Sequence, residues 1–402
     1  MPVAGIICEY NPFHLGHAWM LEQLKEQGMD AIVCAMSGNF VQRGEFAILT
    51  KQARAEMAVR CGADLVLELP TEWSAAGAER FARGGVALLE QTGVVTHLAF
   101  GSECGNAAAL DSLAEILDGE AYQAAVQKEL LSGKSFAVCR RMAVAKVAGE
   151  ETAALLDKPN NNLGIEYCRA LRRMKSPMEI TTVSRTGADH DGAPKSGIAS
   201  ASHVRQLLLN DQAAEAVTYL PQESAQVLLR EMAEGRAPVS MERCERAILA
   251  CLRRMEETDF LPYDGGGEGL YRRVYRAVQE NCTMEEILDA AKTKRYSHAR
   301  LRRMLLAAYL RLPTDPVPEK LPYLRLLAAN QRGRQLLRTM QKNHVPVLTK
   351  PADVARLGPA AEAFFKAEAQ RTDVYTLAYP DVHQSRCGAD WRLVPILLRG
   401  EV

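Results

Sequence analysis

Two hydrophobic patterns alternate along the first 105 residues, and this alternation restricts the fold more than any other feature of the chain. Four short apolar runs are typical of strands buried on both faces of a parallel sheet: VAGIIC, DAIVCAMSG, ADLVLELP and HLAFGSE. The segments between them have helical patterns, and in TKQARAEMAVRCG the first and last residues, Thr50 and Gly62, suit the two caps. Strands and helices in this order predict an α/β fold with a doubly wound parallel sheet.

The rest of the chain is mostly helical in pattern. Residues 106–150 have the character of a helical insertion, EITTVSR at 179–185 predicts a further strand, and GADHDGAPKSG at 187–197 is a loop by composition. We therefore expect an α/β domain over residues 1–215 and a mainly α-helical domain over residues 216–402.

Composition is typical of a soluble cytoplasmic protein. About 48% of the residues are hydrophobic and 24% are charged, and no window approaches 18 consecutive apolar residues, so we expect no membrane span. The N-terminus lacks the basic and apolar regions of a secretory signal. Ten cysteines without a CxxC pair or a zinc-like spacing indicate reduced thiols.

Basic residues concentrate in the second half, although 49 basic and 49 acidic residues give a net charge of zero. Residues 292–303, KTKRYSHARLRR, contain six basic residues and no acid, and residues 321–350 contain no Asp or Glu. We therefore expect a polyanionic partner to bind this half.

The stretch EYNPFHLGH, residues 9–17, lies where the first strand ends and a helix begins. Gly16 would let a phosphate approach the backbone, the helix N-terminus offers N–H groups, and His14 and His17 can donate hydrogen bonds to phosphate oxygens. This predicts a site for displacing pyrophosphate from a nucleotide α-phosphate. The same histidines could instead cap the helix or bind a metal, and the residues alone leave these alternatives open.

The HxGH pattern resembles the first signature of the HIGH nucleotidyltransferase superfamily. The second signature of that superfamily, a hydroxyl-rich turn with an arginine three residues after its last hydroxyl, is similar to IASASHVR at 198–205. The resemblance implies a Rossmann-like domain in which Ser200, Ser202 and Arg205 hold the β- and γ-phosphates of ATP.

Longer strings resemble the bacterial tRNA(Met) cytidine acetate ligase family: GIICEYNPFHLGH, MSGNFVQRGE, KQARAEMAVRCGADLVLELP, FGSE, KPNN.LGIEY, SGIASAS..R and KRYSHARLRRMLL. The resemblance covers most of the chain, densely to about residue 205. Two departures are visible: Phe46 stands where proline is expected after RGE, and Asn162 stands where isoleucine is expected in PNNILG. Both lie beside the groups to which we attribute chemistry.

The resemblance implies an enzyme with two half-reactions. ATP activates acetate as acetyl-adenylate and pyrophosphate leaves; the acetyl group then passes to N4 of the wobble cytidine of elongator methionine tRNA, giving N4-acetylcytidine. His14 and His17 would be catalytic, and Mg²⁺ would accompany the β- and γ-phosphates, with no metal bound tightly by the protein. Residues 1–215 would activate acetate, and residues 216–402 would bind tRNA.

The resemblance also implies a set of ATP contacts. Gly101 would admit adenosine, although a tight turn also explains a glycine there, and Asn161 or, as second choice, Asn160 would read the adenine edge, although either could cap a helix. Arg185 would reach phosphate or adenine, or would end a strand in solvent. The expected ATP-binding residues are Ile7, Cys8, Glu9, Tyr10, Asn11, Pro12, Phe13, His14, Leu15, Gly16, His17, Ala18, Trp19, Met20, Gly101, Asn160, Asn161, Arg185, Ser200, Ser202 and Arg205.

Position alone suggests the remaining contacts. Lys51 and Arg54 could add positive charge to the site or form a solvated helix face. The segment after the second strand provides four candidates for binding the acetate carboxylate: Ser37, Asn39, Gln42 and Arg43. Residues 292–310 are expected to form one helix, with Leu301, Met304, Leu305 and Tyr309 on its core face and with tRNA bound by Lys294, Arg295, Arg302 and Arg303.

Two rival functions compete with this interpretation. A small-metabolite adenylyltransferase would use the same nucleotide site, but a small substrate needs no basic helical half. A tRNA-binding factor without turnover would not need His14, Gly16, His17 and Arg205 together.

Overall fold

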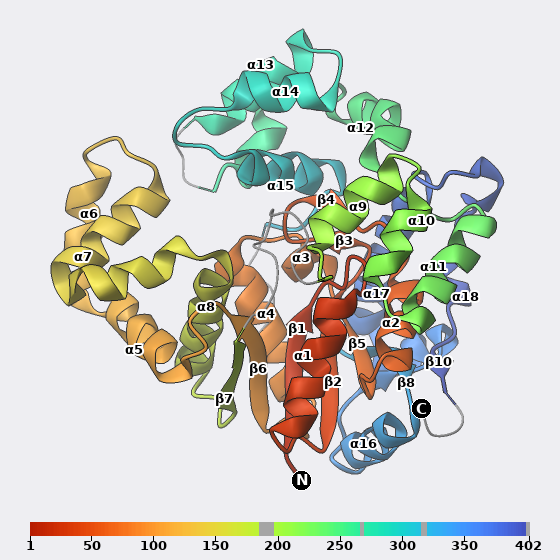
Figure 1. The fold of residues 1–402 in the computed structure, drawn as a ribbon. Helices are drawn as coiled ribbons and strands as arrows, with labels where there is room; N and C mark the ends of the chain where they lie inside the picture. Colours follow the sequence, from red (N-terminus) through yellow and green to blue (C-terminus); the bar gives the residue numbers. More distant parts are fainter. Residues whose placement is uncertain (185–196, 266–268, 315–319, 399–402) are drawn as a thin grey trace.

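A mostly parallel sheet forms the centre of the computed structural model, which describes residues 1–184, 197–265, 269–314 and 320–398 (Figure 1). β1 pairs in parallel with β2 on one side and β6 on the other, so the strand order reverses at β1. The predicted doubly wound α/β fold is confirmed. The strands lie in the spatial order β10 (Ile396–Leu397), β8 (Leu324–Ala329), β5 (Leu65–Leu69), β2 (Ala31–Ser37), β1 (Val3–Cys8), β6 (His97–Ser102) and β7 (Glu179–Ser184).

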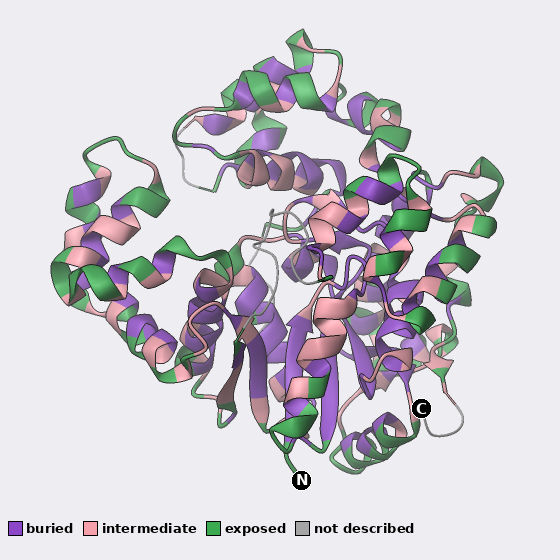
Figure 2. Cartoon of the chain, in the orientation of Figure 1, coloured by how far each residue is buried: buried purple, intermediate pink, exposed green. Residues whose placement is uncertain are grey.

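Helices cover both faces of the sheet because both faces of its central strands are apolar. Val3 and Ile7 of β1 belong to one apolar core, whereas Ala4 and Ile6 belong to the other. Figure 2 shows the central strands buried along their length. The first core includes side chains of α4 (Ala78–Gln91), α8 (Pro159–Met174) and α16 (Gln331–Lys342); the second includes side chains of α1 (Leu15–Glu26), α2 (Lys51–Arg60), α9 (Ala201–Leu209) and α11 (Gln222–Ala233).

β8 is a strand in the half of the chain that we predicted to be mainly helical. It runs antiparallel to β5 and also pairs with β9 (Val347–Leu348). Its sequence, LRLLAA, is a short apolar run, and such a run has no periodicity that separates a buried strand from a buried helix. The sheet therefore includes residues from beyond the predicted boundary near 215.

Two groups of helices project from the sheet (Figure 1). One is an arm of α5 (Ala107–Asp118), α6 (Glu120–Leu130) and α7 (Phe136–Ala154). The other packs around a separate apolar core and comprises α12 (Glu245–Leu252), α13 (Leu270–Glu280), α14 (Met284–Ala291) and α15 (His298–Tyr309).

Helix α15 begins later than the sequence pattern predicts. Ser297 is its N-cap, and the Ser297 hydroxyl accepts a hydrogen bond from the Arg300 N–H. Lys294 and Arg295 therefore precede the helix rather than lying on it. The expected core face is confirmed by the burial of Leu301, Met304, Leu305 and Tyr309.

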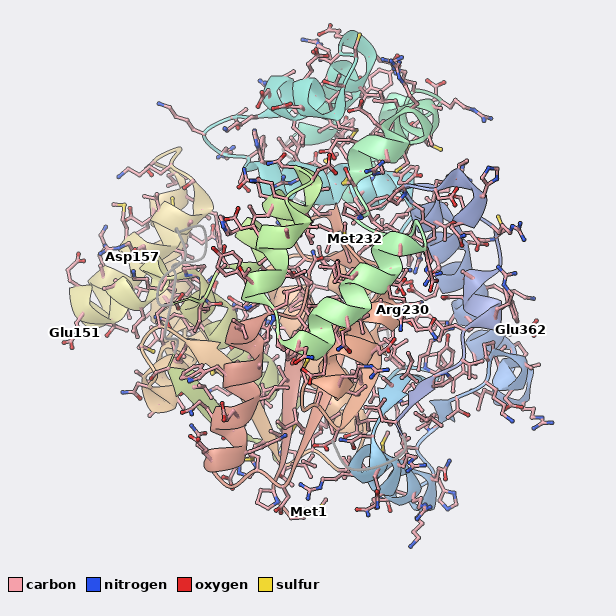
Figure 3. All side chains as sticks on the ribbon, turned by 45° about the vertical axis from the view of Figure 1, so that its right-hand side comes forward. Met1, Glu151, Asp157, Arg230, Met232 and Glu362 are labelled. Carbon is pink, nitrogen blue, oxygen red and sulfur yellow. The ribbon has the colours of Figure 1, made fainter. Side chains whose placement is uncertain are left out.

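An ion pair holds α11 against α2. Figure 3 labels Arg230 on α11, where its guanidinium bonds the Glu56 carboxylate of α2 at 2.8 Å.

No helix of the described residues is long and apolar enough to cross a membrane. The remaining bounds are β3 (Phe40–Val41), β4 (Glu45–Phe46), α3 (Thr71–Ser74), α10 (Ala213–Ala216), α17 (Pro359–Thr376) and α18 (Ala389–Arg392).

Candidate active site at the carboxyl ends of β1 and β6

A cavity of about 230 Å³ lies at the carboxyl ends of β1 and β6, where the strand order reverses. Open α/β sheets bind their ligands at this position. The β1–α1 loop, the β3–β4 hairpin and the first turns of α8 and α9 complete the walls. A smaller cavity of about 50 Å³ shares five lining residues with it: His14, His17, Met20, Gly101 and Ser200.

The two histidines of HLGH form the N-terminal cap of α1. Nδ1 of His14 accepts the Gly16 N–H at 3.0 Å, and Nδ1 of His17 accepts the His14 N–H at 3.2 Å. Because Nδ1 is an acceptor in both rings, the neutral imidazoles carry their protons on Nε2, which is then a donor toward an anion. The helix cap, one of the alternatives for these histidines, is therefore compatible with phosphate binding.

Gly16 has a steric reason to be a glycine, and the predicted close approach of a phosphate stays a prediction. A Cβ atom at this position would lie 2.9 Å from Cε1 of His14 and 3.3 Å from Cγ2 of Ile198. The glycine therefore makes room for the capping imidazole and for the segment before α9, which together shape the wall of the site.

The second signature forms the start of α9. Ser200 is the N-cap, and its Oγ accepts the His203 N–H at 3.2 Å. Arg205 donates to the Asn11 carbonyl oxygen at 3.0 Å and to Oγ of Ser202 at 3.3 Å. Since Ser200 and Arg205 line the larger cavity, the N-termini of α1 and α9 and a guanidinium meet there.

Lys51 and Arg54 are buried, so the solvated-face interpretation is wrong. Their exposed fractions are 2% and 0%. Lys51 forms ion pairs with Glu68 at 2.7 Å and Asp390 at 2.8 Å. Arg54 lies behind the cavity and donates to three backbone carbonyl oxygens, those of Glu9, Gly38 and Leu49.

Most of the residues expected to bind ATP in the stretch 7–20 lie at these cavities. Four do not line either cavity: Pro12, Phe13, Leu15 and Ala18. Gly16 and Trp19 line the smaller cavity. The larger cavity is lined by Ile7, Cys8, Glu9, Tyr10, Asn11, His14, His17 and Met20.

Asn160 and Asn161 have different environments in the first turn of α8. Asn160 lines the larger cavity and donates through Nδ2 to Glu103 at 2.7 Å. Oδ1 of Asn161 accepts the N–H groups of Glu103 and Cys104 at 3.0 and 3.2 Å, so our first choice is bonded to the turn after β6. Neither residue caps the helix, because the N-cap is Lys158. Arg185 lies outside the described residues.

Burial raises the pKa of the Glu103 carboxyl, but hydrogen bonds from Asn160 and Asn161 outweigh burial and hold the pKa below its usual value. This carboxylate therefore stays ionised and fixes the first turn of α8 against the end of β6.

The four candidates for acetate binding separate into two pairs. Gln42 and Arg43, in the β3–β4 hairpin, line the larger cavity, whereas Ser37 and Asn39 do not. Oδ1 of Asn39 accepts the Lys51 N–H at 2.9 Å, and Asn39 lines a separate polar cavity of about 470 Å³.

Helix α15 packs directly on this hairpin. Arg302 forms an ion pair with Glu45 at 3.1 Å, and Arg303 donates to the Gln42 carbonyl oxygen at 3.3 Å. A Cβ atom at Gly44, whose φ is +76°, would lie 2.5 Å from the Arg303 backbone nitrogen. Two of the four predicted tRNA contacts therefore hold α15 to the hairpin.

A cleft of about 1030 Å³ lies between α4, α8 and α15. Burial lowers the pKa of Arg303, and the nearby charges of Arg300 and Arg302 lower it further. Four carboxylates line the cleft, namely Glu72, Glu79, Glu166 and Asp264, against six arginines: Arg80, Arg83, Arg169, Arg173, Arg300 and Arg303. Lys294, Arg295 and Arg302 are not among its lining residues.

Sequence reasoning missed the apolar wall of the larger cavity, which comprises Phe81, Phe100, Leu163 and Tyr167. The segment NNNLGIEY could have predicted part of this wall. Asn160, Leu163 and Tyr167 are spaced by three and four residues, so they share one helix face.

Comparisons with known proteins agree with this geometry. The HIGH Nucleotidyl Transferase family profile matches residues 1–390. The tRNA(Met) cytidine acetate ligase of Syntrophomonas wolfei is 37% identical, with 98% of this chain and 99% of that protein covered. The protein of the same name from Caldanaerobacter subterraneus is 36% identical, with 94% and 96% covered.

Two crystal structures of Thermotoga maritima TmcAL, one apo and one bound with alpha-thio ATP, have TM-scores of 0.93 and 0.91. Each is 32% identical and covers 100% of both chains. The chain therefore belongs to the tRNA(Met) cytidine acetate ligase family of HIGH nucleotidyl transferases.

Proposed function

We propose that this chain is an ATP-dependent ligase that makes acetyl-adenylate from acetate and transfers the acetyl group to N4 of the wobble cytidine of elongator methionine tRNA. One observation carries the proposal: two helix N-termini, the His14 and His17 donors and Arg205 meet at one cavity. The name shared by the relatives supports acetate and tRNA as substrates, and the alpha-thio ATP bound by the Thermotoga protein supports the nucleotide.

In the first half-reaction an acetate oxygen attacks the α-phosphorus of ATP and pyrophosphate leaves. Negative charge spreads over the phosphoryl oxygens, so the enzyme must mainly align the reactants and stabilise that charge. Nε2 of His14 and of His17 donates to the α-phosphate, and Ser200 and Arg205 bind the leaving pyrophosphate at the start of α9. Asn160 reads the adenine beside Gly101.

Acetate binds next to the hairpin, where the Arg43 guanidinium pairs with its carboxylate and Gln42 lies alongside. A magnesium ion would accompany the triphosphate. Its chemistry when bound is to neutralise charge on the β- and γ-phosphates.

The tRNA anticodon loop occupies the arginine-lined cleft between α4, α8 and α15. Arg80 lies at this cleft; burial lowers its pKa and the neighbouring Arg83 lowers it further, whereas Glu72 opposes the change. Arg80 is half-buried and Arg83 is exposed, and a polyanion stabilises neighbouring arginine charges that repel one another. Arg303 lies at the cleft and donates to the Gln42 carbonyl oxygen of the hairpin. A cytidine turned out of the anticodon loop therefore passes this hairpin to reach the adenylate.

The decisive experiment incubates the protein with ATP, isotopically labelled acetate and methionine tRNA, followed by mass spectrometry of the tRNA nucleosides. We expect labelled N4-acetylcytidine and one pyrophosphate for each acetyl group transferred. A requirement for acetyl-CoA in place of acetate and ATP would refute the adenylate mechanism. Transfer of AMP to a small phosphate ester, with no change in the tRNA, would favour the adenylyltransferase.

The cleft assignment predicts that Arg80→Gln weakens tRNA binding and reduces its salt dependence. Loss of one phosphate contact lowers the slope of log K against log[salt] by about one. A suitable control is Arg338→Gln on α16, which Figure 1 shows at the opposite end of the sheet. Equal slopes for Arg80→Gln and the wild type, measured by filter binding between low and high salt, would place the RNA elsewhere.

A further inference from the structure

Acetyl transfer needs a proton acceptor that acetate activation does not need. Acetate enters activation as an anion, so no proton moves when its oxygen attacks the α-phosphate. The cytidine N4 amine, by contrast, must lose a proton when it forms an amide, and a positioned base accelerates such a step. The question is which side chain of the cavity can take that proton.

Two carboxylates, those of Glu9 and Glu45, line the larger cavity within the described residues. Glu45 is held by arginines: Oε1 pairs with Arg302 at 3.1 Å, and Oε2 lies 3.9 Å from Arg205. Both oxygens of the Glu45 carboxylate therefore face guanidinium groups of the protein. The capping hydrogen bonds occupy Nδ1 of both histidines, and their Nε2 atoms are donors.

Glu9 has a different environment at the end of β1. Its Oε1 accepts the Gln42 N–H at 2.8 Å, which anchors the side chain between β1 and the hairpin. The carboxyl group lies in the same wall as His14 and Arg205. Burial raises the pKa of Glu9, while the Gln42 N–H and Arg205 oppose this effect. A carboxylate with a raised pKa is a stronger base, and an anchored one is already oriented.

We propose that Glu9 accepts the proton of the cytidine N4 amine during acetyl transfer. The N4 electron pair forms the new C–N bond to the acetyl carbon, the bond from that carbon to the phosphate oxygen breaks, and its electron pair leaves with AMP. The N4 proton passes to the Glu9 carboxylate and then to solvent. This inference rests on the proposed function and assigns Glu9 to its second half-reaction alone.

The test separates the two half-reactions in a Glu9→Gln variant. Its amide oxygen can still accept the Gln42 N–H, so the loop anchor is preserved. Because Glu9 also lines the nucleotide cavity, the readout is the comparison of two losses: acetate-driven ATP–pyrophosphate exchange should fall much less than acetyl transfer. Single-turnover transfer from preformed acetyl-adenylate should fall by about 10²- to 10⁴-fold, the usual contribution of general base catalysis.

The pH dependence gives a second readout. Wild-type transfer should rise with pH through an ionisation above the pKa of a free glutamate, and this acidic limb should disappear in Glu9→Gln. Glu45→Gln, which removes the other carboxylate of the same wall, should keep the limb whatever its absolute rate.

Three results would overturn the inference: normal transfer by Glu9→Gln, equal losses in exchange and transfer, or wild-type transfer with no ionisation on the acidic side. Equal losses would make Glu9 a ligand for ATP or its magnesium. If Glu9→Gln unfolds below the assay temperature, the wild-type pH profile of the transfer step decides. Absence of exchange in the wild type would instead refute the proposed function.

Discussion

Arg54 connects three backbone segments behind the active site, and its replacement by methionine should destabilise the whole protein. The guanidinium is 0% exposed and donates to the carbonyl oxygens of Glu9, Gly38 and Leu49. Glu9 follows β1 and Gly38 follows β2, so one side chain fixes the two loops that frame the cavity. Methionine keeps an unbranched apolar stem but has no donor.

The expected loss can be worked out from these contacts. A hydrogen bond to a charged group contributes about 1.5–3 kcal/mol, and a buried carbonyl left without a donor costs about 1–3 kcal/mol. The three contributions are not independent, because one rigid group makes all of them. Three carbonyls without a donor would cost about 3–9 kcal/mol if they acted independently, and because they do not, we expect Arg54→Met to cost about 3–5 kcal/mol. That is a large part of the 5–15 kcal/mol typical of a folded domain.

Urea denaturation followed by circular dichroism measures the free energy of unfolding. The matched control is Arg60→Met on the same helix, because the Arg60 side chain is 40% exposed. Its partner Glu56 is buried but keeps its ion pair with Arg230 at 2.8 Å, so the loss of Arg60 leaves no unpaired buried charge and should cost about 0–1 kcal/mol. A free energy of unfolding for Arg54→Met within 1 kcal/mol of the control would refute the argument from buried carbonyls.

Two further predictions concern catalysis and acid stability. His17→Ala should reduce acetate-dependent ATP–pyrophosphate exchange by about 10²- to 10³-fold, the cost of losing one donor to a developing oxyanion, with tRNA affinity within twofold of the wild type; unchanged exchange would exclude His17 from the chemistry. Glu103 has a lowered pKa in the folded state, so its contribution to stability is present above its ordinary pKa of 4.5 and is lost as the pH falls through the folded value. Glu103→Gln should therefore lower the free energy of unfolding at pH 7 more than at pH 3, and an equal effect at both pH values would contradict the role of this carboxylate.

The sequence was most informative where local pattern and chemistry coincide. The strands around β1 have uninterrupted apolar runs, and HLGH and SASHVR each place polar groups at a helix start, so their meeting in one crevice follows from the doubly wound topology. The choice between Asn160 and Asn161 could not be made in this way. Adjacent residues point 100° apart on a helix, and only the position of the turn after β6 decides which one faces the cavity.

The hydrophobic pattern of the sequence did not predict which charged side chains are buried. For KQARAEMAVR the sequence left open whether Lys51 and Arg54 lie at the site or on a solvated face. The partners of Lys51 come from β5 and from Asp390, more than 300 residues away. Periodicity contains no information about a partner so distant in the chain. For the same reason the sequence did not predict that Arg302 pairs with Glu45, and its expected contact with tRNA stays a prediction.

One residue of the hairpin connects the two sites that the proposed reaction must bring together. The Gln42 N–H is bonded to the Glu9 carboxylate in the nucleotide cavity, and the Gln42 carbonyl oxygen accepts from Arg303 of α15 at the cleft. The proposed base and the proposed RNA-binding wall are therefore connected through a single residue, Gln42. RNA that displaces Arg303 would change the hydrogen bonding of Gln42 and, through it, the position of Glu9. The hairpin thus provides a physical reason for acetyl-adenylate to react with the cytidine when tRNA is in the cleft.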